Sequence, residues 1–200
     1  MLIAGLTGGM ACGKSVVARE LSNFGCHIIE ADEIGREVMQ PGSAAYDPIV
    51  GAFGQGILNE DRSINRSALA ARVFGNAEEL ARLNAIVHPA VHGEEQRRIR
   101  EIAARDPHAI VIHVAAILIE SGAYKGVDKI IVVTCTREQQ IERAMARTGA
   151  VESAVIARLD HQMPLEKKKT YADYLIDAGG TEEDTLRQTK IVWENLRRQA

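Results

Sequence analysis

Short runs of apolar residues are spaced along the chain, and the longer segments between them carry apolar residues at every third or fourth position. Short uninterrupted runs are typical of strands in a parallel sheet covered on both faces, and the wider spacing is typical of helices. The five runs are residues 2–6, 27–30, 109–114, 129–133 and 174–177. We therefore expect an α/β fold of three layers with a five-stranded parallel sheet.

One long segment interrupts this alternation. Residues 33–107 carry helical spacing, for example at Leu80, Leu83 and Val87, and no strong strand pattern. We therefore expect a single domain over residues 1–200 with a helical insertion at 33–107. The parts of the core are then residues 1–32, 108–147 and 171–200.

The end of the chain predicts a capped helix. Gly179 and Gly180 follow the last strand, and Thr181 and Asp184 have the spacing of a capping box. The residues that we expect to face the core from this helix are Leu186, Trp193 and Leu196.

The first strand runs into a glycine-rich loop at residues 8–15, which fits the phosphate-binding pattern G-x-x-x-x-G-K-[ST]. A chance glycine-rich turn is the alternative, but the strand before it and the helical spacing after it favour phosphate binding. Lys14 is expected to reach the β- and γ-phosphates of a nucleotide, and the Ser15 hydroxyl to bind Mg²⁺. The loop positions expected to contact the nucleotide are Gly9, Ala11, Cys12, Gly13, Lys14, Ser15 and Val16.

An acidic residue follows the second predicted strand. Asp32 lies just beyond the carboxyl end of the run at 27–30. Because ligands of such sheets bind at the carboxyl ends of the strands, Asp32 and the glycine-rich loop are expected on the same rim.

Three classes of protein use such a loop. A switch GTPase needs an Asn-Lys-x-Asp segment after a late strand, but Val133 is followed by Thr-Cys-Thr-Arg. An ATPase needs an Asp at the end of an apolar strand, which the runs at 110–116 and 130–134 lack. A small-molecule kinase is favoured, because Asp32 is available to orient an acceptor hydroxyl.

Positive charge gathers between the fourth and fifth strands. Arg143 and Arg147 are four residues apart and share a helical face, where cations would stabilise a transferring phosphoryl group. Arg158 and Lys167–Lys169 follow. For the lysine run we favour an ordinary solvated basic face.

The net charge and the cysteine content limit the partners and the cellular compartment that we expect for this protein. A net charge of −3 gives no general attraction to nucleic acid. Cys12, Cys26 and Cys135 lack the spacing of a metal site or disulfide framework, and we interpret Cys12 as a small residue that fits the loop rather than as a reactive thiol. No signal peptide or membrane span is indicated, so we expect a cytoplasmic protein without nucleic-acid or membrane partners.

Several short segments together point to one family. They occur in order from end to end, and in them the chain resembles the dephospho-coenzyme A kinases. The segments are Leu6–Gly9, Gly13–Ser15, Ala31–Asp32, Glu37–Gly42, Phe53–Gly54, Leu83–Pro89, Leu118–Glu120, Gln140–Arg143 and Ala172–Asp177.

This resemblance implies transfer of the γ-phosphoryl group of ATP, with Mg²⁺, to the ribose 3′-hydroxyl of dephospho-coenzyme A. It implies that the insertion binds the acceptor and that an arginine-rich lid, here residues 148–170, closes over the site. By this likeness Asp32 is the base and Arg143 clamps the phosphates, with Arg147 beside it at the nucleotide. A monomer or weak homo-oligomer is expected.

Two further positions match the family on the acceptor side, Arg36 and His88. For His88 the alternative is a histidine at a helix end before Pro89.

The chain also departs from the family's usual residues, notably at Ala11, Cys12 and Val16 in the loop. The Ala11 Cβ is expected to strain the loop. Other departures are Glu30, Ala115–Ala116, Thr148 and Ala178. We expect these changes to affect rate and affinity more than the type of reaction. Two alternatives stay open: a kinase for another small hydroxylated acceptor and, because of the altered loop positions, a nucleotide-binding protein without catalysis.

Overall fold

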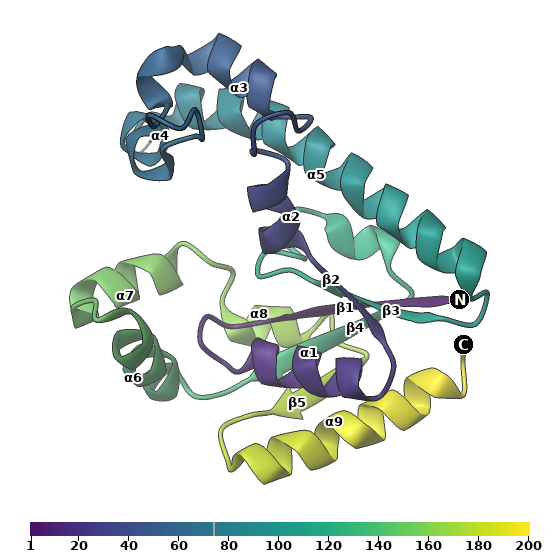
Figure 1. Ribbon diagram of the computed structural model, residues 1–200. Coiled ribbons are helices and arrows are strands. Elements are labelled where there is room, and N and C mark those ends of the chain that lie inside the picture. Colours follow the sequence, from purple (N-terminus) through teal and green to yellow (C-terminus); the bar gives the residue numbers. More distant parts are fainter. Residues whose placement is uncertain (74) are drawn as a thin grey trace. The chain divides into compact units, whose positions relative to one another are not determined.

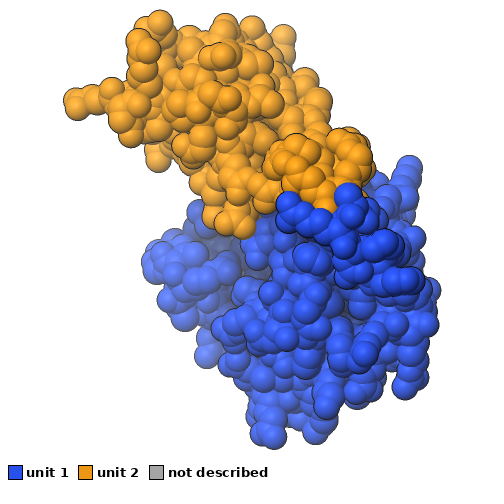
Figure 2. Space-filling view, turned by 45° about the vertical axis from the view of Figure 1, so that its right-hand side comes forward, with its two compact units in different colours: residues 1–30, 102–200 blue, residues 31–101 orange. Residues whose placement is uncertain are grey.

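The chain forms two compact units (Figure 2). The computed structural model describes residues 1–73 and 75–200. The first unit contains residues 1–30 and 102–200, and the second contains residues 31–101. Each unit has buried apolar side chains of its own.

The first unit is built on a five-stranded sheet whose strands all run parallel (Figure 1). The strand order is β2-β3-β1-β4-β5. The predicted five-stranded parallel sheet is therefore confirmed. The strands are β1 (Leu2–Gly8), β2 (His27–Glu30), β3 (Ile110–Val114), β4 (Lys129–Thr134) and β5 (Tyr174–Asp177).

Helices cover the sheet. On one face α1 (Lys14–Asn23) and α9 (Glu182–Arg197) bury their apolar sides against alternate strand residues. On the opposite face the buried Leu118 side chain lies against Gly5. This layered packing explains why the central strands are apolar at consecutive positions. The core between the sheet and the two helices includes Leu6, Val17, Leu21, Ile112, Val133, Ile176 and Leu196.

The last helix begins as predicted but buries a different set of residues. The Thr181 Oγ1 accepts from Asp184 N at 3.1 Å, which confirms the cap. Leu196 is buried, whereas Trp193 and Leu186 are only half-buried. Two threonines are buried instead, because each hydroxyl donates to the carbonyl four residues earlier and loses no hydrogen bond on leaving water. The buried residues of α9 are Thr185, Thr189, Val192 and Leu196.

Three helices lie between β4 and β5. These are α6 (Arg137–Thr148), α7 (Glu152–Asp160) and α8 (Leu165–Lys169). Thr136 and Gln139 form a complete capping box at the start of α6. Apolar residues of α6 and α7 pack together, and Arg137 pairs with Asp160 at 2.8 Å, so the two helices form one small hairpin.

In residues 31–73 and 75–101, the second unit contains helices and loops, a short 3-10 turn, Gln55–Ile57, and one isolated bridge between Leu58 and Ile64. It contains α2 (Ala31–Glu37), α3 (Tyr46–Phe53), α4 (Arg66–Val73) and α5 (Ala77–Arg105), the last extending four residues beyond it. The helical character predicted for this segment is confirmed. No helix in residues 1–73 or 75–200 combines the length and apolar character that a membrane span requires.

Pro89 lies inside α5 and does not end it. The interpretation of His88 as a helix-terminal histidine is therefore wrong. Proline removes one backbone donor and leaves the carbonyl of Ala85 without its usual helical partner. Ala85 and Pro89 are both exposed, so water can satisfy that carbonyl.

The prediction that the lysine run is a solvated face is wrong for Lys168, whose side chain is 0% exposed. Its Nζ donates to the Ala116 carbonyl at 2.7 Å and pairs with Glu120 at 2.9 Å. Glu120 also accepts from the Met163 N–H at 3.1 Å. A buried ammonium needs such partners, and together they fasten the chain around α8 to the segment after β3.

The pKa of the Glu120 carboxyl is lowered. Burial works against its charge, but hydrogen bonds from Lys168 and from backbone N–H groups outweigh the effect of burial. Its stabilising contribution is therefore present above the ordinary carboxyl pKa and is lost as pH falls.

Replacing Lys168 by methionine should lower the free energy of unfolding by about 3 kcal/mol, because it leaves a partly buried carboxylate without its partner. Lys167→Met is the matched control. Lys167 is exposed in the same helix, so its loss should change stability by less than about 0.5 kcal/mol. Urea unfolding of both variants measures the difference, and equal effects would contradict the role of the pair.

Candidate active site

The glycine-rich loop connects β1 to α1, as its pattern predicts. Gly8 is the last residue of β1, and a Cβ on it would lie 2.2 Å from the Val133 carbonyl oxygen of β4. Gly13 precedes α1 with a φ of 89°, which favours glycine. Both positions therefore need glycine, one for close approach and the other for backbone conformation.

The interior of the loop rests on the hairpin of α6 and α7. A Cβ on Gly9 would lie 2.8 Å from Gln140 Oε1, so the loop backbone closes against this buried glutamine of α6. Ala11 has a φ of 58°, a conformation that costs a non-glycine residue about 1–2 kcal/mol. Met10 and Ala11 pack on the apolar cluster of α6 and α7, and this contact offsets part of the strain.

The start of α1 is built to receive an anion. Its N-cap residue, Gly13, offers no side-chain cap, and its first turn contains no acidic residue. By contrast, α6 and α9 begin with capping threonines and carry acidic residues in their first turns. A helix N-terminus without a side-chain cap or a nearby acidic residue keeps its partial positive charge and is therefore suited to bind phosphate.

Lys14 lies across the loop. Its Nζ donates to the carbonyl oxygens of Gly8 at 3.3 Å and Gly9 at 2.9 Å. Ser15 follows in the first turn of α1 and is exposed. The Lys14 ammonium and the Ser15 hydroxyl are the kinds of group that bind a nucleotide's phosphates and Mg²⁺.

A pocket of about 240 Å³ lies beside the loop. It brings Arg143 of α6 to the same cavity as the loop residues Ala11 and Gly13 and as Val16 of α1. Among residues 1–73 and 75–200, no carboxylate pairs with Arg143, so its charge is available to a ligand. The remaining wall comes from the segment after β5 and the start of α9, namely Ala178, Gly180, Glu182 and Thr185.

A hydrogen bond holds the wall of this pocket in place. Gln139 Nε2 donates to the Gly179 carbonyl at 2.7 Å, which ties the start of α6 to the Gly179–Gly180 turn. Arg147, one helical turn beyond Arg143, is exposed and does not line the pocket. The structure thus brings only the first of the two predicted arginines to the loop.

Asp32 and Arg36 are both exposed on α2, in the second unit. They are four residues apart and therefore share a face of this helix. His88 is exposed on α5. None of the contacts described within this unit joins His88 to Asp32 or Arg36.

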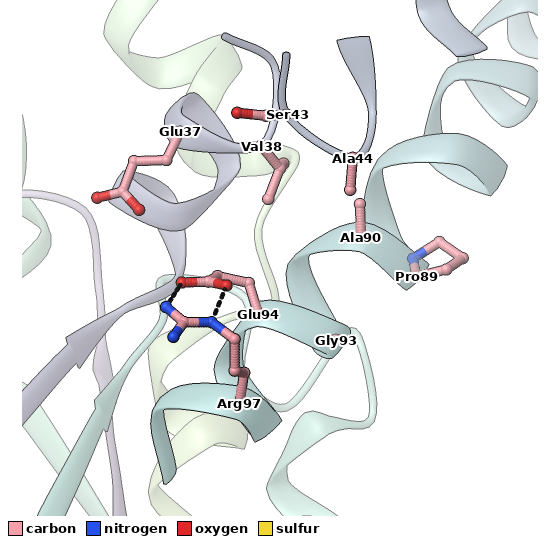
Figure 3. Close-up of a pocket in the computed structure, with 9 residues that line it drawn as sticks. All are labelled: Glu37, Val38, Ser43, Ala44, Pro89, Ala90, Gly93, Glu94 and Arg97. Carbon is pink, nitrogen blue, oxygen red and sulfur yellow. Dashed lines mark hydrogen bonds and ion pairs between the residues drawn. The ribbon is translucent and has the colours of Figure 1, made fainter. Parts of the chain in front are cut away.

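The second unit also holds a cavity of about 510 Å³ that the sequence analysis missed (Figure 3). Its wall is largely apolar, with Ala44 and Ala90 facing one another, and Gly93 opens onto it. At one end Glu94 and Arg97 pair at 2.7 Å. The three-residue spacing of Glu94 and Arg97 in the sequence could have indicated this ion pair.

The Glu94 carboxyl is held ionised. Hydrogen bonds from Arg97, and then from Arg98, lower its pKa to about 2. Arg98 also pairs with Glu37 of α2, which fixes α2 against α5 within this unit.

The chain is similar to proteins of one known family. The family model described as dephospho-CoA kinase matches residues 2–184. A dephospho-CoA kinase of Geobacter metallireducens is 45% identical over 194 residues, covering 97% of this chain and 96% of that protein. The corresponding protein of Geobacter sulfurreducens is 42% identical over 193 residues, covering 96% of this chain and 98% of that protein.

A solved structure extends the likeness to the fold. The dephospho-CoA kinase of Campylobacter jejuni superposes with a TM-score of 0.75 at 25% identity and covers 98% of each chain. The match of the family model, together with relatives above 40% identity over nearly the whole length, shows that this chain belongs to the dephospho-CoA kinase family.

Proposed function

We propose that this enzyme transfers the γ-phosphoryl group of ATP to the ribose 3′-hydroxyl of dephospho-coenzyme A and releases coenzyme A and ADP. The observation that carries the proposal is the pocket at the glycine-rich loop, where Arg143 lies beside an uncapped helix start in a chain of this family. This arrangement supplies what phosphoryl transfer needs most, namely positioning and positive charge.

On the donor side, the backbone N–H groups of the loop and the field of α1 hold the β- and γ-phosphates. Lys14 exchanges its carbonyl partners for phosphate oxygens, and Arg143 stabilises charge that spreads over the transferred group. Mg²⁺ would be held by Ser15 and the phosphates and would neutralise their charge. Arg147 lies beside Arg143 at the nucleotide, and the proposed lid, residues 148–170, excludes water.

On the acceptor side, Asp32 orients the 3′-hydroxyl and accepts its proton, while the phosphorus–oxygen bond to ADP breaks. Two observations support this role. The carboxylate is exposed, and it lies two residues after β2, whose carboxyl end is at the same sheet edge as that of β1. Arg36 and His88 contact the acceptor's phosphates as cations or hydrogen-bond donors.

The helical segment 33–107 binds the rest of the acceptor. Its cavity of about 510 Å³ combines an apolar wall with polar groups at one end, which suits a long chain that carries amide groups. We also propose that the enzyme is cytoplasmic and is a monomer or a weak homo-oligomer.

The direct test measures ADP release with ATP and Mg²⁺, with and without dephospho-coenzyme A. We expect acceptor-dependent ADP and a product heavier by one phosphoryl group. Transfer to a different hydroxylated compound in a panel, or ATP binding without any transfer, would overturn the assignment of the acceptor or of catalysis, respectively.

Asp32→Asn should keep ATP affinity and lose turnover by about a hundredfold or more, because the amide cannot accept the proton. Glu33→Gln is the matched control, since Glu33 is the neighbouring exposed carboxylate in the same helical turn. Steady-state kinetics with both variants measures kcat. Normal kcat in Asp32→Asn would remove this residue from its role.

Arg143→Ala should lower kcat by about a hundredfold, because it removes a positive charge at the phosphates. Arg147→Ala should have a clearly smaller effect, because Arg147 lies outside the pocket on the same helix. The ratio of the two kcat values, measured at saturating ATP, tests the assignment. Equal losses would show that the pocket does not define the phosphate site.

Gly93→Leu should raise the KM for dephospho-coenzyme A and leave the KM for ATP unchanged, because the new side chain enters the cavity. Folding should not suffer, since leucine favours a helix by about 1 kcal/mol over glycine and a Cβ there meets no atom. The control is Gly51→Leu, at an exposed helical glycine that does not line the cavity. An unchanged acceptor KM in Gly93→Leu would exclude this cavity as the acceptor site.

A further inference from the structure

Two cysteines far apart in the sequence meet at the glycine-rich loop. Cys12 lies within the loop, and Cys135 directly follows β4. Their Sγ atoms are 2.7 Å apart and share a hydrogen bond, and both are free thiols. A disulfide bond is about 2.05 Å long, so closing the gap needs a movement of only about 0.7 Å. Interpreting Cys12 as a small residue that fits the loop does not account for this second sulfur.

The two thiols differ in access. Cys12 is fully buried. Cys135 is half-buried and lines a second cavity of about 270 Å³, together with Gly9 and residues of the segment before α8. A small reagent that enters this cavity meets Cys135 first and finds Cys12 directly behind it.

The environment favours the thiolate at Cys135. The hydrogen bond with Cys12 lowers the pKa of the Cys135 thiol, and the positive charges of Arg143 and Lys14 add to this effect against the opposing effects of burial and of the Asp177 carboxylate. The same hydrogen bond, with burial, raises the pKa of the Cys12 thiol. Cys135 is thus the nucleophile, and Cys12 supplies the second thiol.

We propose that Cys12 and Cys135 form a redox-sensitive thiol pair, which low-molecular-weight disulfides convert into an intramolecular disulfide that weakens nucleotide binding. The Cys135 thiolate attacks a sulfur of the small disulfide and releases one small thiolate. Cys12 then loses its proton and attacks Cys135 Sγ, which releases the second small thiolate. The protein loses two hydrogen atoms, and one small disulfide becomes two thiols.

The effect on binding follows from the position of Cys12 and rests on the proposed ATP site. The Cys12 N–H donates to the Gly9 carbonyl at 3.3 Å, so a displacement of this residue is transmitted to the loop backbone. The new bond ties the loop to the end of β4. Because the loop's N–H groups must point at the phosphates, a shift of this size is expected to lower ATP affinity about tenfold.

The experiment treats the full chain with excess oxidised glutathione and analyses it before and after reduction. Intact mass should fall by two hydrogen atoms, and trypsin should release the fragments 1–14 and 130–137 joined by a disulfide. ATP affinity, measured by titration calorimetry, should fall about tenfold and recover on reduction. Each variant is compared with its own untreated sample.

The control is Cys26→Ala. Cys26 is buried, and burial raises the pKa of its thiol to about 11, so this variant should respond to oxidation as the wild type does. Cys135→Ser should show no loss of ATP affinity on treatment.

Three outcomes would overturn the proposal. These are the absence of the joined fragments, a stable mixed disulfide at Cys135, and a joined pair with unchanged ATP affinity. If the untreated protein binds no ATP, the proposed function fails, and the fragment analysis still decides whether the two thiols pair.

Discussion

The candidate site depends on the close approach of two interior parallel strands, β1 and β4, at their carboxyl ends. Because Gly8 has no Cβ, the end of β1 lies against the Val133 carbonyl of β4. The chain that leaves β4 enters α6 beside the loop, with Gln140 against Gly9 and Arg143 at the neighbouring pocket. A larger residue at position 8 would separate the strands and with them the loop, the arginine and the thiol pair.

Local patterns made much of this fold predictable. The strands of a covered parallel sheet are short and apolar, and the capping residues Thr181 and Asp184 are close in sequence, so both could be identified without coordinates. The loop was equally clear, because its glycines and Lys14 have a fixed spacing. Distant partners left no such signal. Lys168 is buried because Glu120 and Ala116 lie beside it, about fifty positions earlier in the chain.

In the candidate site, too, local patterns could be predicted from the sequence and contacts between distant residues could not. Arg143 and Arg147 are equivalent by helical spacing, and only the packing of α6 on the loop distinguishes them. The cavity beside Gly93 depends on side chains from α5 and the segment after α2, which no periodicity brings together. The contact of Cys12 with Cys135 spans 123 positions and depends on the order of β1 and β4 in the sheet.

The hydrogen bonds of Lys14 affect how its interaction energy is divided between ATP affinity and reaction rate. Its ammonium donates to the Gly8 and Gly9 carbonyls, and these bonds orient it across the loop. In the proposed reaction, ATP replaces these neutral acceptors by charged ones, and the bonds given up reduce the net gain in ground-state affinity. The charge that develops on the transferred group meets no such compensation. Under the proposed function, the interaction energy of Lys14 therefore contributes more to rate than to affinity.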